Sequence, residues 1–353
     1  MVGIKALAKH LDLSIGTVSR ALNAKPDVNV KTRRRVLQAA KDLGYRPNHS
    51  GRSLRNGRTQ TIGMVLETGS ASTLGGDTFF MHLIDAMQET LAKHGQDLIL
   101  LPCRSADDPI EFLRRTVTRR TVDALVITAT RRQDPRIALL LEDGMPFLAL
   151  GRSETPGDYH WIDLDFAGVA RRSVEELVRL GHRRIAVAAP RRDVNLAHVF
   201  IDGYRAALAD HGLPVDDTLI LRESASENGG RHVADALLKM PERPTAVVLG
   251  HELMAIGLYS RLTEAGQMPG RDLSVIGFRQ NNQLRFLRPD LACFALDLTA
   301  LGHLVGETVL AVTTGATLDV PNNIVWPMNY VPGSSVQELA MPIGRQERKD
   351  AGA

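Results

Sequence analysis

Residues 11–30, LDLSIGTVSRALNAKPDVNV, decide how the N-terminal end of the chain folds. Ser14 is a good helix N-cap, because its hydroxyl oxygen can accept a hydrogen bond from a backbone amide of the first turn. Three side chains form the apolar face of the helix that follows: Val18, Ala21 and Leu22. Three others point the opposite way: Ile15, Ser19 and Arg20. Gly16 adds no side chain and weakens the helix. The stretch predicts a short helix to about Asn23 with one face left for a partner.

Helices are also predicted on both sides of this stretch. Upstream, apolar residues recur at the i, i+3, i+4, i+7 spacing of an amphipathic helix: Ile4, Leu7, Ala8 and Leu11. Residues 12–13 allow only a tight turn. Downstream, Asn29 can cap a third helix, which Gly44 ends and Pro47 prevents from resuming. Its expected buried stripe consists of Val36, Leu37, Ala40 and Leu43. Two short helices joined by a tight turn, with a third beneath them, form a helix-turn-helix domain.

Charge is distributed unevenly along the chain. Residues 1–60 hold 13 Lys and Arg against three Asp and Glu, a net charge of +10, whereas the rest of the chain has a net charge of −7. A basic head on a mildly acidic body favours a polyanionic partner for the head alone. The alternative is that the basic residues only form a solvated surface.

Beyond a polar, basic linker at 48–60, apolar runs alternate with amphipathic segments. The expected strands lie at 61–66, 97–101, 123–128, 146–150, 183–189, 245–250 and 272–278. The expected helices lie at 79–94, 108–120, 135–143, 166–180, 197–212, 227–239 and 252–265. Fully apolar strands that alternate with helices predict parallel sheets covered on both faces. These strand–helix units are too many for one sheet, so we expect two doubly wound α/β lobes.

Several functional classes lack their signature in this sequence. The first residues lack the apolar run of a signal peptide, and no stretch approaches the roughly 20 apolar residues that span a bilayer. Cys103 and Cys293 form neither a disulfide framework nor a metal motif, and the eleven histidines lack ligand spacing. Nucleophile-elbow, phosphate-loop, dinucleotide and zinc-protease motifs are absent. We therefore expect a cytoplasmic protein that is not an enzyme and that needs no metal or cofactor.

Several segments together resemble the lactose/galactose repressor (LacI/GalR) family of bacterial transcription regulators. They are TVSRALN (17–23), KTRRRVLQAAKDLGYRPN (31–48), TIGMVL (61–66), LVRLGHRRIAVAAP (177–190), DGYRAAL (202–208), MAIGLY (254–259) and DLSVIGF (272–278). The resemblance implies a DNA-binding domain at 1–47, a hinge helix at 48–60, a core like a type I periplasmic binding protein at 61–340 and a disordered tail at 341–353. Within the core it implies a first lobe at about 61–160 and 292–325, and a second at about 161–291 and 326–340.

The resemblance assigns DNA contacts by matching position. The base-reading positions are Ile15, Gly16, Ser19 and Arg20, and Arg20 can form a bidentate contact with guanine. Because Gly16 offers no hydrogen bond and Ile15 only an apolar contact, direct readout is expected to be sparse. Ser14 and Asn23 would hold phosphates, and the remaining implied contacts are Thr17, Asn29, Tyr45 and Asn48. In the hinge, Leu54 matches a leucine that wedges between base pairs, flanked by Arg52 and Arg55 on phosphates; alternatively, Leu54 only packs on the core.

The core implies a cleft for a sugar or related metabolite beyond the carboxyl ends of the strands. The candidate effector residues are Phe80, Arg152, Trp161, His198, Phe200, His251, Glu252 and Arg279. Three of them depart from the family pattern: Phe200 replaces an Arg, His251-Glu252 replaces Asn-Asp, and Arg279 replaces an Asp. Two hypotheses follow. Either Arg279 binds an acidic ligand such as a sugar acid or sugar phosphate, or it pairs with Glu252 and the ligand is a neutral sugar or polyol. Phe80 and Trp161 could instead be ordinary packing residues.

We therefore predict a ligand-responsive repressor that binds a pseudo-palindromic operator in double-stranded DNA as a homodimer, in the cytoplasm at the nucleoid. The C-terminal segment lacks the leucine heptads of a tetramerising coiled coil. The alternative is a solute-binding protein of a sugar transporter, which has the same core fold. The basic N-terminal head argues against that alternative.

Overall fold

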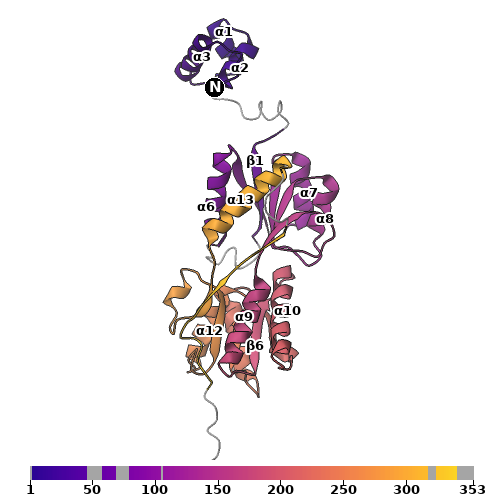
Figure 1. The fold of residues 1–353 in the computed structure, drawn as a ribbon, viewed down its shortest axis with the longest axis vertical. Coiled ribbons are helices and arrows are strands. Elements are labelled where there is room, and N and C mark those ends of the chain that lie inside the picture. Colours follow the sequence, from indigo (N-terminus) through magenta and orange to yellow (C-terminus); the bar gives the residue numbers. More distant parts are fainter. Residues whose placement is uncertain (1, 46–57, 69–78, 105, 317–322, 340–353) are drawn as a thin grey trace, which may run out of the picture. The chain divides into compact units, whose positions relative to one another are not determined.

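The computed structural model describes residues 2–45, 58–68, 79–104, 106–316 and 323–339 (Figure 1). The chain divides into two compact units, residues 1–60 and 61–353. The first unit is the basic head, and the second is the α/β core.

The described residues of the head form three helices, as the sequence predicts. Its helices are α1 (Ile4–Leu11), α2 (Ile15–Leu22) and α3 (Val30–Asp42). The expected caps are present: the Ser14 hydroxyl accepts from the Thr17 amide at 3.0 Å, and the Asn29 side chain accepts from the Lys31 amide at 2.8 Å. Leu37 is 49% exposed, so its assignment to the buried stripe is wrong. Ala39 takes that place, because it lies three residues from Val36 on the face that packs.

The first lobe of the core is built on a six-stranded parallel sheet in the order β11-β5-β4-β3-β1-β2. Its strands are β1 (Thr61–Glu67), β2 (Asp97–Cys103), β3 (Ala124–Thr128), β4 (Phe147–Leu150), β5 (His160–Leu164) and β11 (Asn323–Trp326). Two pairs of helices cover its faces: α6 (Phe79–Lys93) with α13 (Leu298–Thr314), and α7 (Pro109–Arg119) with α8 (Pro135–Asp143) (Figure 1).

The second lobe repeats this arrangement with the strand order β12-β10-β9-β8-β6-β7. Its strands are β6 (Ile185–Pro190), β7 (Ile220–Glu223), β8 (Ala246–Leu249), β9 (Ser274–Arg279), β10 (Ala292–Ala295) and β12 (Asn329–Val331), and only the β10–β12 pair is antiparallel. One face is covered by α9 (Phe166–Arg179) and α10 (Asn195–Asp210), the other by α11 (Glu227–Lys239) and α12 (Glu252–Glu264). Short 3-10 turns lie at Asp217–Leu219 and Leu284–Phe286. The lobes are therefore two doubly wound α/β units, as predicted.

The predicted lobe boundaries are displaced at two places. Strand β5 pairs with β4, so residues 161–164 lie in the first lobe and not in the second. Strand β10 pairs with β9, so residues 292–295 lie in the second lobe and not in the first. Within the described residues the chain therefore crosses between the lobes after β5, after β10 and between β11 and β12. A strand's own sequence does not determine which sheet it joins, because apolar side chains suit either core.

Helices α11 and α12 cross at very short range. A Cβ atom at Gly257 would collide with the carbonyl oxygen of Glu227, and one at Gly230 would collide with that of Met254. Glycine is required at both positions because the two helix backbones touch there.

Candidate nucleic-acid interface and effector cleft

The exposed surface of α2 carries most of the predicted base-reading positions. Ile15 is 46% exposed, and the Arg20 side chain is exposed with its Nε 3.5 Å from the Asp27 carboxylate. A Cβ atom at Gly16 would meet its nearest neighbour, the Ser14 hydroxyl oxygen, at an ordinary 3.7 Å. The packing of the head therefore does not require a glycine at this position.

Ser19 departs from the prediction. It is only 9% exposed, so its expected position on the outer face with Ile15 and Arg20 is wrong. Its carbonyl oxygen accepts a hydrogen bond from the Asn23 side chain at 2.7 Å, which closes the C-terminal end of α2. The exposed readout surface of α2 is therefore smaller than the sequence pattern indicates.

The other predicted DNA contacts lie around α2 or outside the described residues. Thr17 is half-buried and its hydroxyl lies 2.9 Å from that of Ser14, so it supports the helix cap. Asn29 is exposed, and Tyr45 is half-buried against the core of the head. Four predicted contacts fall outside the residues that the structure describes: Asn48, Arg52, Leu54 and Arg55.

Two arginines of the head have structural roles that sequence reasoning missed. Arg33 donates to the carbonyl oxygen of Lys25 at 2.5 Å, and Arg35 donates to that of Leu11 at 2.6 Å. The bonds tie α3 to the segment after α2 and to the last residue of α1. Part of the positive charge of the head therefore positions α2.

The core contains a cavity of about 360 Å³ between the carboxyl ends of the two sets of strands. This lies within the range of about 300–1,000 Å³ of small-molecule sites. Five of the eight predicted effector residues line it: Phe80, Arg152, His251, Glu252 and Arg279. Lining residues that sequence reasoning did not single out include Glu67, Thr130, Asp163 and Arg192. Each of these lies within two residues of the carboxyl end of a strand, which is the signal that could have identified them.

The second lobe contributes a buried ion pair to the cavity wall. Arg279 donates to the Glu252 carboxylate at 2.5 Å, and the two side chains are only 4% and 2% exposed. The Arg279 guanidinium also lies 4.8 Å from the centre of the Phe79 ring, a cation–π contact with α6 of the first lobe. The cation that stands where the resemblance implies an Asp is therefore neutralised by the Glu252 carboxylate.

The first lobe contributes a second ion pair. Arg152 donates through Nε to the Asp163 carboxylate at 2.6 Å, and its guanidinium lies 5.5 Å from the centre of the Trp161 ring. Burial raises the pKa of Asp163 above its ordinary value, although the charge of Arg152 opposes this shift. Arg152 and Asp163 therefore form a paired cation and carboxylate in the cavity wall.

Three predicted effector residues do not line the cavity. Trp161 packs with the side chains between the sheet and the α7–α8 pair, and it reaches the site only through Arg152. Phe200 is fully buried and packs edge-on against Phe278, beneath the cavity wall. His198 lies 2.9 Å from the Asp193 carboxylate. Helical and strand periodicity locates these residues on elements next to the cleft but does not determine which side of the element faces it.

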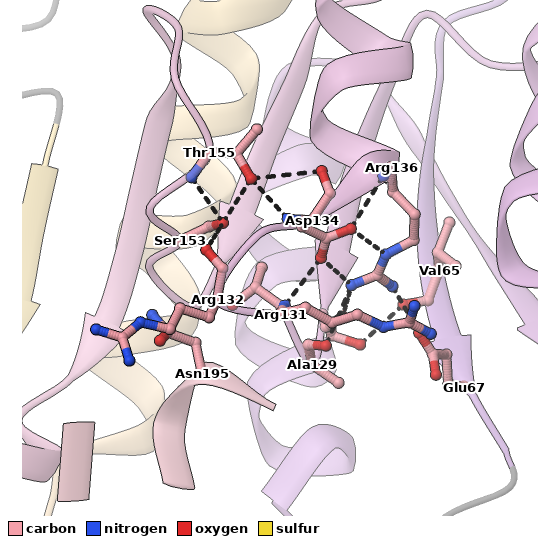
Figure 2. A network of polar contacts seen from close by, with 12 residues as sticks. Val65, Glu67, Ala129, Arg131, Arg132, Asp134, Arg136, Ser153, Thr155 and Asn195 are labelled. Carbon is pink, nitrogen blue, oxygen red and sulfur yellow. Dashed lines mark hydrogen bonds and ion pairs between the residues drawn. The ribbon is translucent and has the colours of Figure 1, made fainter. Parts of the chain in front are cut away.

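A buried polar network stands behind the first-lobe wall (Figure 2). Arg136 at the start of α8 donates to the Glu67 carboxylate at 2.7 Å and to that of Asp134 at 2.7 Å and 3.0 Å. Burial by itself raises the pKa of Asp134, but hydrogen bonds and the charge of Arg136 bring it below its ordinary value. The sequence contains no local signal for this network, because Arg136 and Glu67 are 69 residues apart.

Two family models match the chain, one on each unit. Residues 4–48 match the model of bacterial regulatory proteins of the lacI family. Residues 59–324 match the model of periplasmic binding proteins and the sugar-binding domain of the LacI family. The chain belongs to the lacI family of bacterial regulatory proteins. Since the second match covers most of the core and the first covers the head, this lacI-family protein is a DNA-binding transcriptional regulator and not a transporter subunit or an enzyme.

Relatives match this lacI-family regulator along almost its whole length. It is 34% identical to the HTH-type transcriptional regulator AglR of Rhizobium meliloti, over 95% of this chain and 94% of the relative. It is 31% identical to the HTH-type transcriptional regulator RafR of Escherichia coli, over 95% and 98%. The solved complex of the transcriptional regulator CelR with cellobiose is 25% identical, with a TM-score of 0.71 over 95% and 100% of the two chains.

The Lac repressor dimer bound to operator and the anti-inducer ONPF has the same fold, with a TM-score of 0.82 and 23% identity over 95% of this chain and 99% of the other. In the described part of this lacI-family regulator, no helix is long and apolar enough to cross a membrane. No group of three or more His, Cys, Asp or Glu side chains among those residues could hold a metal ion.

Proposed function

We propose that the protein is a repressor that binds a pseudo-palindromic operator as a homodimer, in the cytoplasm at the nucleoid, and that a neutral sugar in the core cleft controls its operator affinity. The DNA part is supported by the exposed face of α2 and by the net charge of +10 in residues 1–60. A helix-turn-helix head contacts one half-site, so two heads on a two-fold axis read a palindrome. The Lac repressor, whose fold this chain has, binds its operator as a dimer.

In this proposal the leading edge of α2 reads few bases. Arg20 is the side chain there that can form a bidentate contact with guanine. Ile15 offers an apolar contact to a thymine methyl group. Gly16 has no side chain, although the head itself has room for a Cβ atom there. A glycine at this position allows the helix to approach the groove floor closely. Ser19 is largely buried and makes no base contact in this proposal.

The neutral character of the effector is supported by the pairing of charges around the cavity. Four arginines of the described residues line it, and each lies beside a carboxylate: Arg152 with Asp163, Arg191 with Glu223, Arg192 with Glu67, and Arg279 with Glu252. An anionic ligand that took Arg279 for itself would leave a buried carboxylate without its partner, which costs about 3–5 kcal/mol. Sugar hydroxyl groups can instead donate to the carboxylates and accept from the guanidinium groups that remain paired.

The experiment is a thermal unfolding scan of the full-length protein with neutral and anionic sugars. Cellobiose and other neutral disaccharides are compared with gluconate and glucose 6-phosphate. Saturation to about 100 times the dissociation constant stabilises the folded state by about 2.7 kcal/mol, a rise in Tm of about 5 °C. We expect this rise with a neutral sugar. A rise with gluconate or glucose 6-phosphate alone would contradict the neutral-effector proposal.

The DNA-binding proposal has its own experiment. Sites selected from a random duplex pool are expected to contain a two-fold repeat, and the protein is expected to bind them with an affinity that changes when the stabilising sugar is added. Selection of sites without two-fold symmetry would contradict binding as a dimer.

A further inference from the structure

The loop between β6 and α10 of the second lobe reaches across the cleft to the first lobe. Arg192 in this loop forms an ion pair with Glu67, the last residue of β1. The Glu67 side chain is 6% exposed, whereas that of Arg192 is 39% exposed. The cation therefore comes from the more solvated side and meets a carboxylate that is already buried in the other lobe.

The Glu67 carboxylate is held in place from behind by Arg136. Besides its bonds to Glu67 and Asp134, Arg136 donates to the carbonyl oxygens of Thr128 and Ala129, both at 3.1 Å, where β3 ends (Figure 2). Because Arg136 is 2% exposed and bonded through its whole guanidinium, it is a fixed part of the first lobe. Arg192 is the member of this charge cluster that belongs to the second lobe.

A second set of contacts joins the same two lobes at the first turn of α10. The Asn195 amide donates to the carbonyl oxygen of Thr130 at 2.8 Å, and the Asn195 side chain donates to that of Arg152 at 2.9 Å. The Thr130 hydroxyl donates to the same Arg152 oxygen at 2.9 Å. Asn195 is 3% exposed, so opening of the cleft would expose all of these groups to water.

We propose that Arg192 and Asn195 form a latch that holds the two lobes closed on Glu67, Thr130 and Arg152, independently of any effector. The latch lowers the free energy of the closed arrangement through contacts made only there, which is the requirement for shifting an equilibrium between two arrangements. It makes Arg192 a residue that sets how readily the cleft opens. The inference does not depend on which ligand the cleft binds or on which DNA the head reads.

The backbone amide of Asn195 provides a direct measure of latch opening. Its hydrogen-bond acceptor lies in the other lobe, so its hydrogen exchange requires the lobes to separate or the lobe to unfold. The amide of Gly250 donates to the Ala188 carbonyl oxygen at 2.7 Å within the second lobe and therefore reports on unfolding of that lobe alone. Exchange at both amides is measured by mass spectrometry with electron-transfer fragmentation on the full-length protein, without effector or DNA.

The test compares Arg192→Gln with Arg184→Gln. Arg184 pairs with Asp216 at 2.8 Å within the second lobe, and its side chain is 34% exposed, close to that of Arg192. Arg192→Gln is expected to speed exchange at Asn195 by about tenfold and to leave Gly250 within about twofold of the wild type. Arg184→Gln is expected to leave the ratio of the exchange rates at Asn195 and Gly250 within about twofold of the wild-type ratio. Arg192→Lys keeps the charge and is expected to recover part of the protection.

The latch is refuted if Arg192→Gln and Arg184→Gln give the same ratio of exchange rates at Asn195 and Gly250. It is equally refuted if Arg192→Lys exchanges as fast as Arg192→Gln, because the cation would then contribute nothing. A general loss of stability in a variant raises the exchange rate at both amides, so it cancels in the ratio of the two rates.

Discussion

Substitution of Arg279 by Met should lower the free energy of unfolding of the core by far more than the loss of packing by one side chain. The Arg279 Nη2 atom lies 2.5 Å from the Glu252 carboxylate, and both side chains are almost completely buried. The substitution keeps an apolar side chain next to Phe79 and leaves the carboxylate near the His251 ring, 3.9 Å away. Removing one partner of a buried ion pair costs about 3–5 kcal/mol, because the remaining charge has lost its solvation as well as its partner.

The double variant Arg279→Met/Glu252→Gln separates this penalty from the value of the pair. It removes both charges of this pair, so it should recover most of the loss and unfold within about 1–2 kcal/mol of the wild type. The loss in the double variant should therefore be smaller than the sum of the losses in Arg279→Met and Glu252→Gln, each of which leaves one buried charge without its partner. The measurement is urea unfolding of the full-length protein at constant concentration, followed by circular dichroism.

The control is Arg231→Met, which breaks an exposed ion pair with Glu264 in the same lobe at 2.7 Å. No resolvable change in the urea midpoint is expected, since exposed pairs are screened by water. A cost of less than about 1 kcal/mol for Arg279→Met would contradict this prediction, and so would single losses that simply add in the double variant. In that case Glu252 would not depend on Arg279, and an anionic effector could engage the guanidinium at little cost.

Three further predictions concern other parts of the molecule. Burial holds the pKa of His182 below its ordinary 6.5, so the unfolded chain takes up this proton first as the pH falls. The free energy of unfolding therefore decreases as the pH drops below about 6.5. In urea unfolding curves, the stability advantage of the wild type over His182→Gln should shrink between about pH 7.5 and 5.5. Gly257→Ala should cost at least about 1–3 kcal/mol, measured by thermal unfolding, because the new methyl group would meet the Glu227 carbonyl oxygen. Arg20→Ala should relax base preference at one position per half-site by about 1–3 kcal/mol in a competition assay with single-base operator variants; uniform weakening across all variants would instead make Arg20 a phosphate contact.

Much of the fold was predictable because its elements have strong local signals. The caps Ser14 and Asn29 and the apolar stripes around them predict the three helices of the head, and the apolar runs predict the main strands of both sheets. The errors occur where local pattern is insufficient. Leu37 has an apolar side chain on the exposed side of α3, and Ser19 has a polar one on the buried side of α2. Both positions were assigned by residue type, although helix packing alone decides which side is covered.

The candidate site was predictable to the level of its loops. Residues that follow strands β4, β8 and β9 line the cavity, because the carboxyl ends of parallel strands meet at one edge. Trp161, His198 and Phe200 do not line the cavity, because the rotation of β5 and α10 relative to the cleft depends on packing against distant elements.

A basic helix-turn-helix head and a two-lobed α/β core follow from local patterns in the amino-acid sequence, and so do the departures from the family pattern at Arg279 and Glu252. Three contacts are visible only in the folded molecule: Arg279 and Glu252 neutralise each other, Arg136 fixes Glu67, and Arg192 reaches Glu67 from the other lobe. The physical reason is that helices and strands depend on neighbours a few residues apart, whereas charge pairing depends on which distant segments the folded sheets bring together.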